Sequence, residues 1–316
     1  QLVVSSIGLI GLGFDYEFKI FWRNKGFRKV LNLLPARSFD QGMDYVVSLM
    51  ETNLASRMTE GTVRIFQQAT TLHVVPINLI GVSISTAAFP RLTERLSENR
   101  IDLFKDELRS VIRAIIWLAL PVAIITYFTR GYVVSFISHR GNSLMAGLLG
   151  VFAVAILFRC LYHILARSFY AQQDTKTPLY ISIVAISLNV FLAIWFTFSL
   201  RYGAYGLAVA QAIVAIVEVV ILFTMMEMRT PGVLNKYFWQ GILRMASAAG
   251  FMSIICYFMV HWLPFEAGAR SLYEAVPKFI LIVLVSLSTY LMFSRLLQIK
   301  ESEPVMRKLR KVFFRA

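Results

Sequence analysis

Charged and amide side chains recur at helical spacing inside one long apolar segment, residues 28–56. They lie three, four or seven positions apart, which places them on one face of a helix, and they are Arg37, Asp40, Gln41, Asp44, Ser48 and Glu51. Ionisable groups in an apolar setting are costly, so they mark polar cavities, ion paths or partners. Three carboxylates against one guanidinium favour a bound cation, a proton, or a base on another helix. The alternative is that Arg37 pairs with Asp40 or Asp44 and only neutralises the helix.

A row of cationic side chains occupies a second apolar segment, residues 143–170. Arg159, His163 and Arg167 stand four positions apart and share one helix face. This row predicts a seat for an anion such as a diphosphate or a carboxylate. Alternatively, Arg167 extends to the polar interface and His163 is a neutral packed residue. Arg159 lies deeper in the segment and is the stronger candidate.

The segment 62–89 carries a milder polar row and a helix breaker. The polar residues lie roughly on one side, and they are Arg64, Gln67, Gln68, Thr71 and Asn78. Pro76 interrupts the helix and frees backbone carbonyls, which is tolerated where water or neighbouring groups satisfy them. Such broken helices often line transporter cavities. The small residues of 81–88 predict close packing against another helix.

Long apolar helices must position these side chains, because apolar segments fill nearly the whole chain. Hydrophobic residues make up 57% of it, charged residues 16%, and the mean hydropathy is +0.64; a soluble domain carries about 25% charged residues. Segments with the roughly 20 apolar residues of a membrane span are 28–56, 62–89, 111–137, 143–170, 179–200, 204–227, 238–263 and 277–298. The sequence therefore predicts an all-α polytopic membrane protein with about eight full transmembrane helices. A partial helix at 1–13 precedes them, and we expect the chain to begin inside a longer protein.

Lysine and arginine gather on alternate connections between these helices. The positive-inside rule then places 14–29, 90–113, the connection with Arg167 and Lys176, the connection with Arg229 and Lys236, and the C-terminal tail in the cytoplasm. The net charge of +14 thus needs no nucleic acid, and anionic phospholipids are the expected partners of the basic loops. The segment 90–110 and the tail are predicted to be amphipathic helices in the membrane interface. Four scattered histidines give no metal-ligand spacing, and no GxxxxGK[ST] motif indicates an ATP site.

Two longer motifs resemble a known family. Residues 165–178 read LARSFYAQQDTKTP, residues 75–92 read VPINLIGVSISTAAFPRL, and Gly203-Ala-Tyr-Gly206 follows later. Together they closely resemble the MurJ/MviN family of lipid II flippases, which belongs to the MOP (multidrug/oligosaccharidyl-lipid/polysaccharide) exporter superfamily. The resemblance covers about 14–298. It implies a two-lobe fold of fourteen helices around a central cavity, of which this chain holds the end of the sixth helix through the fourteenth.

The resemblance also implies a division of the chain into functional parts. These are 1–13, the end of a truncated transmembrane helix; 14–27, a basic cytoplasmic linker; 28–227, the second-lobe helices that line the cavity; 228–298, two C-terminal helices that form a groove for the lipid tail; and 299–316, a basic cytoplasmic tail.

Candidate site residues fall into two groups. Those expected to bind the anionic head group in the cavity are Arg37, Arg64, Gln67, Thr71, Arg159, His163 and Arg167. Thr71 stands where the family often has an arginine, so Arg64, Arg159 or the first lobe must supply that charge. Those expected to bind a coupling cation or proton are Asp40, Asp44, Glu51, Asn189 and Gln211.

Within the second group, the resemblance implies a sodium site at Glu51, Asn189 and Gln211. Glu51 stands where an aspartate is usual, Asn189 matches an asparagine, and Gln211 replaces a threonine of some members. Ala193 replaces an aspartate of some members, and losing a carboxylate weakens a site for a hard cation. Protonation of Glu51 or Asp44, or the membrane potential alone, therefore remain alternatives to Na⁺, and no other cofactor is expected.

The resemblance predicts a transporter in the bacterial inner membrane, with its C-terminus in the cytoplasm. Lipid II, an undecaprenyl-diphosphate-linked glycopeptide, would pass to the outer leaflet by alternating access for cell wall biogenesis, in association with the cell wall synthesis machinery. One alternative is a flippase for another polyprenyl-linked oligosaccharide, such as the O-antigen type. Another is a prenyltransferase-like membrane enzyme with Mg²⁺ on Asp40 and Asp44. A third is an inactive scaffold, which the changes at Thr71 and Ala193 would explain.

Overall fold

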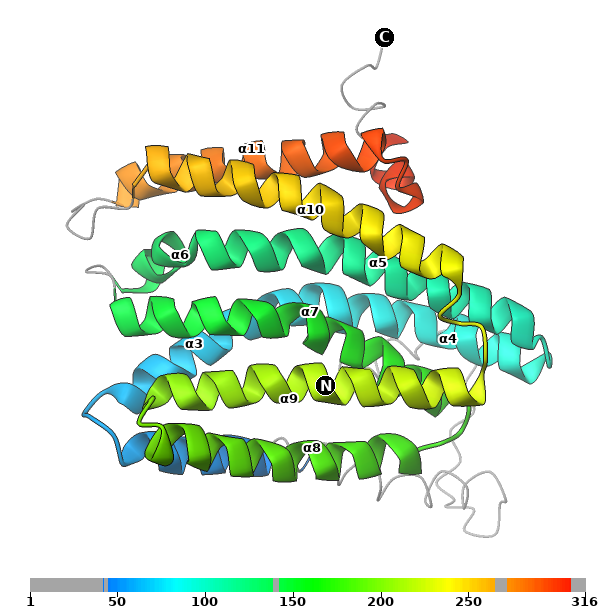
Figure 1. Cartoon of the computed structure of the whole chain (residues 1–316), viewed down its shortest axis with the longest axis horizontal. Coiled ribbons are helices and arrows are strands. Elements are labelled where there is room, and N and C mark those ends of the chain that lie inside the picture. The colour runs from blue at the N-terminus through cyan, green and yellow to red at the C-terminus, as the bar shows by residue number, and fades with distance from the viewer. Residues whose placement is uncertain (1–41, 43–44, 139–141, 265–271, 308–316) are drawn as a thin grey trace, which may run out of the picture.

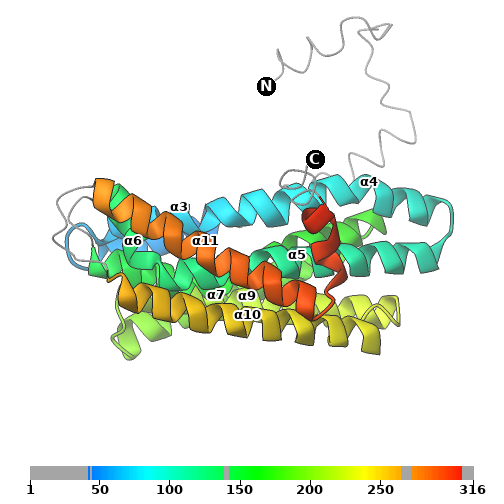
Figure 2. The same ribbon diagram turned by 90° about the horizontal axis from the view of Figure 1, so that it is seen from above.

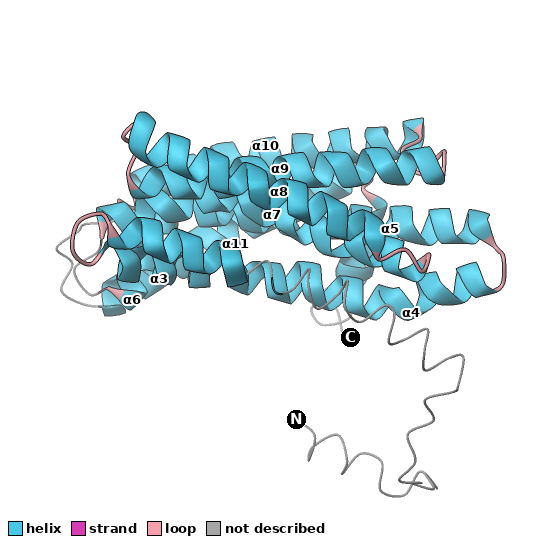
Figure 3. Cartoon of the chain, turned by 90° about the horizontal axis from the view of Figure 1, so that it is seen from below, coloured by secondary structure: helices cyan, strands magenta, loops and turns pink. Residues whose placement is uncertain are grey.

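Helices account for all the regular structure that a computed structural model describes, over residues 42, 45–138, 142–264 and 272–307 (Figure 3). Within these ranges, seven helices are long and apolar enough to cross a membrane. They are Thr62–Ser97, Ile101–Phe128, Ser143–Ala171, Lys176–Ser199, Ala204–Arg229, Lys236–Trp262 and Ala275–Leu296. The prediction of an all-α polytopic membrane protein is confirmed. Of the further helix predicted over 28–56, only residues 42 and 45–56 are described, and they are helical. Residues 1–13 and 14–27 lie outside the described residues.

The first long helix is broken and the others follow it in antiparallel succession (Figure 1). The elements are α3 (Thr62–Pro76), the π-helical η1 (Ile77–Val82), α4 (Ser83–Ser97), α5 (Ile101–Phe128), α6 (Arg130–Ile137), α7 (Ser143–Ala171), α8 (Lys176–Ile194), the π-helical η2 (Trp195–Ser199), α9 (Ala204–Arg229), α10 (Lys236–Trp262), α11 (Leu272–Leu296) and the short 3₁₀ helix η3 (Lys300–Ser302). The connections 97–101, 171–176 and 229–236 lie at one end of the bundle, together with the end of α11 (Figure 1). The helix ends and connections at this end carry many basic residues, and these are Arg91, Arg95, Arg100, Lys105, Arg109, Arg113, Arg167, Lys176, Arg229, Lys236, Arg295 and Lys300.

The prediction of a separate interfacial helix over 90–110 is wrong. α4 and α5 form a helical hairpin, with its turn at 98–100, in which the charged residues belong to the ends of two long helices. Leu92, Phe104 and Leu108 are fully buried between these helices. The apolar side of the segment therefore packs against its own partner rather than against lipid.

α7 is the central helix of the bundle and packs against α3, α5 and α9. Its side chains contribute to both large apolar clusters. Ile156 and Ile164 join the cluster with α5 and α10, whereas Leu148 and Phe152 join the cluster with α3, α8 and α9. Small residues along α9, such as Ala208 and Ala212, let α7 and α9 approach closely.

η1 begins directly after Pro76. The helix break that this proline predicted is therefore confirmed. A Cβ at Gly81 would lie 2.7 Å from the Cα atom of Cys160, so only glycine allows this approach of η1 to α7. The guanidinium of Arg167 donates to the carbonyl oxygen of Val82 at 2.8 Å and to the hydroxyl of Ser85. These bonds satisfy backbone at the end of the π-helical turn.

α10 and α11 pack against each other, and α11 runs obliquely along the bundle (Figure 2). Two hydrogen bonds join α11 to α5. Tyr290 donates its hydroxyl to the carbonyl oxygen of Trp117 at 3.0 Å, and the Trp117 indole donates to the Ser294 hydroxyl at 3.1 Å. The C-terminal pair of helices is therefore fixed to the rest of the bundle through α5.

The connection between α7 and α8 is fastened by Asp174. Its carboxylate accepts hydrogen bonds from the amides of Lys176 and Thr177 at 2.9 and 3.1 Å, and it pairs with Arg229 at the end of α9 at 2.6 Å. Burial by itself raises the pKa of Asp174, but the hydrogen bonds from Thr177 and the Arg229 guanidinium outweigh it, so the pKa lies below its ordinary value. Asp174 belongs to the motif over 165–178, and its role here is structural.

Candidate functional site

A polar cavity of about 380 Å³ lies between residues 45–56, α3, η1, α7, α8 and α9. Its lining residues lie near the middle of the membrane-crossing helices Thr62–Ser97, α7, α8 and α9, so we place it at the depth where a membrane is most apolar. Its polar lining residues are Ser48, Glu51, Thr70, His73, Asn78, Arg159, Tyr162, His163, Ser182, Asn189, Gln211 and Glu218. Five of the candidate site residues meet here, namely Glu51, Arg159, His163, Asn189 and Gln211, together with Ser48 and Asn78 from the two polar rows noted in the sequence.

Glu51 and Gln211 form the most tightly bonded pair in the cavity. The Gln211 amide nitrogen donates to both carboxylate oxygens of Glu51, each at 2.7 Å. Glu51 is only 4% exposed, so its charge is held away from bulk water. A bidentate amide contact fixes the orientation of the carboxylate but leaves its negative charge uncompensated.

Asn189 adds an oxygen that is ready for a ligand. Its side-chain Oδ1 atom is buried and has no hydrogen-bond partner among the described residues. An unpartnered buried carbonyl costs free energy unless something in the cavity satisfies it. One carboxylate and two amide side chains are the kinds of oxygen donor that a hard cation takes, so the residues fit such an ion in kind.

Arg159 and Glu218 form an ion pair across the cavity from α7 to α9. The Arg159 Nη1 atom lies 3.3 Å from Glu218 Oε2. The Glu218 side chain is 4% exposed and that of Arg159 is 29% exposed, so the guanidinium is the partner that reaches open space. Arg159 is thus available to an anion, while a carboxylate behind it offsets its charge.

Glu218 was missed from the sequence. It stands alone in the middle of the long apolar segment 204–227, whose other acid, Glu227, is the last residue, and no repeat of charges at helical spacing draws attention to it. The available signal was its spacing, since Glu218 follows Gln211 by seven residues and so shares its helix face. An intramembrane acid is expected to face a partner rather than lipid.

Two histidines line the cavity in different ways. His73 is buried, stacks on Phe152 at 4.5 Å between ring centroids, and its Nδ1 atom lies 2.8 Å from the carbonyl oxygen of Thr70. His163 lies one turn after Arg159, as the spacing predicted, and lines the same cavity. Among the described residues, no group of three His, Cys, Asp or Glu side chains could hold a metal ion.

The remaining candidates lie elsewhere. Arg167 contacts the end of η1, as described above, and does not line the cavity. Arg64, Gln67 and Thr71 are exposed on one face of α3, where the Thr71 hydroxyl donates to the carbonyl oxygen of Gln67 at 2.9 Å. None of these three residues lines the cavity, although Val74 and Asn78, which follow them along the same side of the helix, do. Arg37, Asp40 and Asp44 lie outside the described residues.

A bundle of membrane-crossing helices with a broken helix and a charged cavity at mid-depth defines a polytopic membrane transporter fold. Known structures agree. The chain superposes on a lipid II flippase MurJ in an inward closed conformation with a TM-score of 0.67 and 21% identity, covering 93% of this chain and 58% of that one. It also superposes on an outward-facing multidrug resistance MATE family transporter of the MOP superfamily, with a TM-score of 0.54 and 11% identity, covering 90% and 69%.

Sequence comparison identifies the family. The model of the lipid II flippase MurJ family matches residues 1–276, and the chain belongs to that family. A probable lipid II flippase MurJ of Thermotoga maritima is 23% identical over 290 residues, which cover 90% of this chain and 56% of that protein. One of Haemophilus influenzae is 29% identical over 223 residues, covering 64% and 41%. The chain therefore spans about half the length of the curated relatives it matches.

Proposed function

We propose that the protein containing this chain is a flippase that moves lipid II from the cytoplasmic to the outer leaflet of the bacterial inner membrane. The observation that carries the proposal is the membrane-embedded Arg159–Glu218 pair, 3.3 Å apart, in a member of a family of lipid II flippases. A guanidinium held in the membrane interior is costly. It is explained by a substrate whose head group carries a diphosphate.

Arg159 binds the substrate diphosphate by exchanging partners. In the structure Glu218 is its counterion, and an entering diphosphate offers more negative charge and bidentate acceptor geometry. His163 lies one helical turn away on the same wall and adds a donor. Because Glu218 remains behind, it restores the resting pair when the substrate leaves. The cavity thus alternates between an internal ion pair and a bound anion.

The exposed face of α3 completes the path on the side away from the described bundle. Arg64, Gln67 and Thr71 place polar groups there, and exposed polar side chains on a membrane-crossing helix are expected to face water or protein rather than lipid. We infer that this face borders the substrate path between this bundle and another lobe of the protein. The C-terminal helices offer exposed aromatic side chains for the lipid tail, including Phe251, Tyr257 and Phe258.

The return of the empty carrier is coupled to a cation at Glu51, Asn189 and Gln211. Na⁺ is the expected ion, because the unpartnered Asn189 oxygen lines the same cavity as the Glu51 carboxylate. A proton on Glu51 is the competing coupling, and the membrane potential supplies about 2.3 kcal/mol per elementary charge per 100 mV in either case. Transport is measured with and without Na⁺. Transport that depends on Na⁺ in the natural protein and loses this dependence in Glu51→Gln would support ion coupling over coupling to the membrane potential alone.

The orientation follows from the basic end of the bundle. Connections 97–101, 171–176 and 229–236 and the end of α11 lie together, so we place this end and the C-terminus in the cytoplasm. Anionic phospholipids are the expected neighbours of these basic segments, and the cell wall synthesis machinery is the expected protein partner.

Complementation tests the proposal. The natural gene that encodes this chain is expressed in a strain depleted of its own lipid II flippase, and lipid II on the outer leaflet is measured. Growth and surface lipid II should return with the natural gene and fail with Arg159→Ala. They should persist with the control Arg130→Gln, whose guanidinium lies outside the cavity, where it donates to the carbonyl oxygen of Tyr127 and lies over the Tyr127 ring. A well-inserted natural protein that does not restore surface lipid II refutes the proposal. Transport of another polyprenyl-linked glycan in that case would favour the O-antigen-type alternative.

A further inference from the structure

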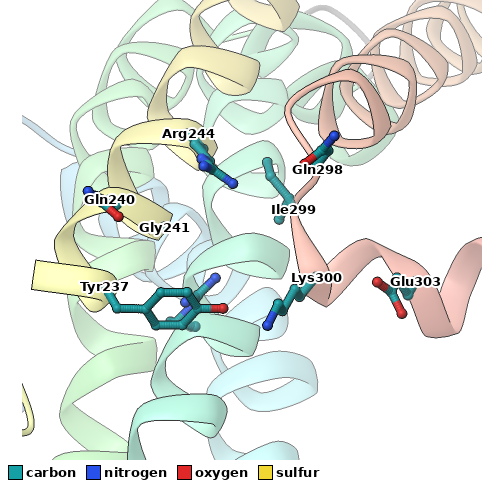
Figure 4. Close-up of a pocket in the computed structure, with 9 residues that line it drawn as sticks. Tyr237, Gln240, Gly241, Arg244, Gln298, Ile299, Lys300 and Glu303 are labelled. Carbon is teal, nitrogen blue, oxygen red and sulfur yellow. The ribbon is translucent and has the colours of Figure 1, made fainter.

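A second cavity of about 330 Å³ opens at the basic end of the bundle (Figure 4). It lies between α5, the first turns of α10 and the segment that follows α11. The residues that line it are Arg113, Tyr237, Gln240, Gly241, Arg244, Gln298, Ile299, Lys300 and Glu303. It shares no lining residue with the central cavity, so the transport cycle proposed above does not account for it.

Two of the charged residues that line the cleft, Arg113 and Glu303, are already paired. Arg113 pairs with Glu301, with Nε 2.6 Å from Oε1 and Nη2 donating to Oε2 at 3.1 Å. Glu303 pairs with Arg307 at 3.4 Å. These pairs fix the C-terminal segment against α5 and leave no net charge of their own.

Arg244 and Lys300 carry the uncompensated charge of the cleft. Among the residues that the structure describes, neither has a carboxylate within ion-pair distance. Arg244 donates only a long hydrogen bond, 3.5 Å, to the carbonyl oxygen of Leu297. The Lys300 ammonium lies 5.3 Å from the ring centre of Tyr237. Figure 4 shows Tyr237 and Arg244 on α10 facing Ile299 and Lys300 across the cleft.

The shape of the cleft is built into the packing. The Arg113 guanidinium lies 4.8 Å from the Tyr237 ring centre. The Lys300 ammonium packs against the same ring, so both cations make cation–π contacts with Tyr237. A Cβ at Gly241 would lie 2.6 Å from Cζ of Arg113, so the glycine makes room for this arrangement. The aromatic ring therefore holds both cations in place before any ligand binds.

The surroundings of the cleft are those of a membrane interface. It lies at the ends of α10 and α11, two of the membrane-crossing helices. Trp239, Leu243 and Leu296 are exposed beside it. An exposed tryptophan at a helix end is typical of the aromatic belt, and exposed leucines next to it offer an apolar surface for acyl chains.

We propose that this cleft binds the phosphodiester head group of an anionic glycerophospholipid of the cytoplasmic leaflet. Arg244 and Lys300 contact the phosphate, Gln240 and Gln298 offer amide groups to the head group, and the acyl chains lie along Leu243 and Leu296. Basic pockets between transmembrane helices on the cytoplasmic side bind anionic head groups in this way. A free anion would use the charges but not the apolar surface. The bound lipid would bridge α10 to the segment after α11.

Native mass spectrometry of the purified natural protein in a neutral detergent tests this site. Phosphatidylglycerol is titrated against phosphatidylcholine of the same chain length. The natural protein should retain one phosphatidylglycerol at least about tenfold more tightly than phosphatidylcholine, and Arg244→Gln/Lys300→Gln should remove that preference. The control Arg57→Gln/Arg201→Gln loses the same charge from exposed residues at the other end of the bundle and should keep it.

The opposite outcomes are equally clear. Equal retention of the two lipids, or equal loss in both double variants, would mean that only the overall charge matters and would overturn the proposal. Displacement of phosphatidylglycerol by millimolar glycerol 3-phosphate would show a free-anion site instead. Because binding is measured without transport, failure here leaves the flippase proposal untouched, and failure of complementation leaves this site untouched.

Discussion

The Arg159–Glu218 pair gives the most demanding prediction, because its energy can be estimated from its geometry. At 3.3 Å, two unit charges attract by about 5 kcal/mol at an effective dielectric constant of about 20. Removing one partner of a buried pair costs about 3–5 kcal/mol, since the other charge is left unpaired. Arg159 is 29% exposed, which lowers the cost of leaving it alone. We expect Glu218→Gln to destabilise the protein by about 3 kcal/mol, near the low end of this range.

The reverse change and the double change complete the cycle. Arg159→Gln removes the ion-pair partner of the more deeply buried Glu218 carboxylate and should cost at least as much. Arg159→Gln/Glu218→Gln replaces the pair by two amides that can hydrogen-bond, and should lie within about 1 kcal/mol of the natural protein. The sum of the two single changes should therefore exceed the double change by about 5 kcal/mol or more, because each single change leaves a charge in the cavity without its ion-pair partner and the double change does not.

Unfolding by sodium dodecyl sulfate in mixed micelles, followed by circular dichroism, measures these differences. The matched control is the same cycle on Arg91 and Glu107, which lie 3.7 Å apart with side chains 73% and 29% exposed. An exposed pair should couple by less than about 1 kcal/mol. Equal coupling in the two cycles, or additive effects at Arg159 and Glu218, would refute the reasoning that a stored ion pair waits for the substrate anion.

Three further predictions concern the helix contact, the loop clasp and the coupling site. Gly81→Ala should destabilise the protein by about 1–3 kcal/mol, because its Cβ would press on the α7 backbone. Gly250→Ala is the control, since its new Cβ would meet no atom of another element within 4 Å. Equal destabilisation by the two changes would contradict the close approach of η1 to α7. The lowered pKa of Asp174 means that its stabilisation is fully present above its ordinary value of 3.8 and is lost as the pH falls through the lower folded value. Asp174→Asn should thus lower the melting temperature at pH 7, and the gap to the natural protein should close in acid; a gap that persists would count against the clasp. Glu51→Gln should slow the return step of transport, whereas Glu51→Asp should retain it. Comparing substrate exchange with net transport in liposomes measures the return step. Normal net transport in Glu51→Gln would show that this carboxylate takes no part in coupling.

Helix positions were largely predictable, because each membrane-crossing helix is a long run of apolar residues that can be recognised in the sequence. The segment 143–170 corresponds to α7, 204–227 to α9 and 238–263 to α10, each within two residues at either end. Pro76 correctly marked the break in the first long helix. Local composition was sufficient in these cases because a helix in a membrane needs no distant partner to form.

The hairpin at 98–100 could not be predicted from the same evidence. Its charged arms look like interfacial helices, since an amphipathic pattern gives one apolar side and does not say what covers it. Leu92 and Leu108 are covered by the opposite arm rather than by lipid. Only the tertiary pairing of α4 with α5 distinguishes the two interpretations.

The lining residues of the cavity were predictable where polar side chains repeat at helical spacing, and were missed where a polar side chain stands alone in its segment. Arg159 and His163 share a face by simple spacing, and the family resemblance brought Glu51, Asn189 and Gln211 together. Glu218 has no neighbour of its kind along the chain, so its role depends on α7 and α9 being adjacent. Which residues pair across two helices depends on how the helices pack, and the sequence of one helix does not contain that information.

The π-helical turn over Ile77–Val82 restricts how this part of the chain can vary among species. A π turn takes up about one residue more than an α turn, which rotates everything that follows by about 100° relative to an unbroken α-helix. Deleting one residue there would restore a regular helix and swing Leu92 out of the core. Substitutions within 77–82 that keep Gly81 should therefore be tolerated far better than any insertion or deletion. Changes of length should instead accumulate in the turn at 98–100, where no downstream face depends on the count.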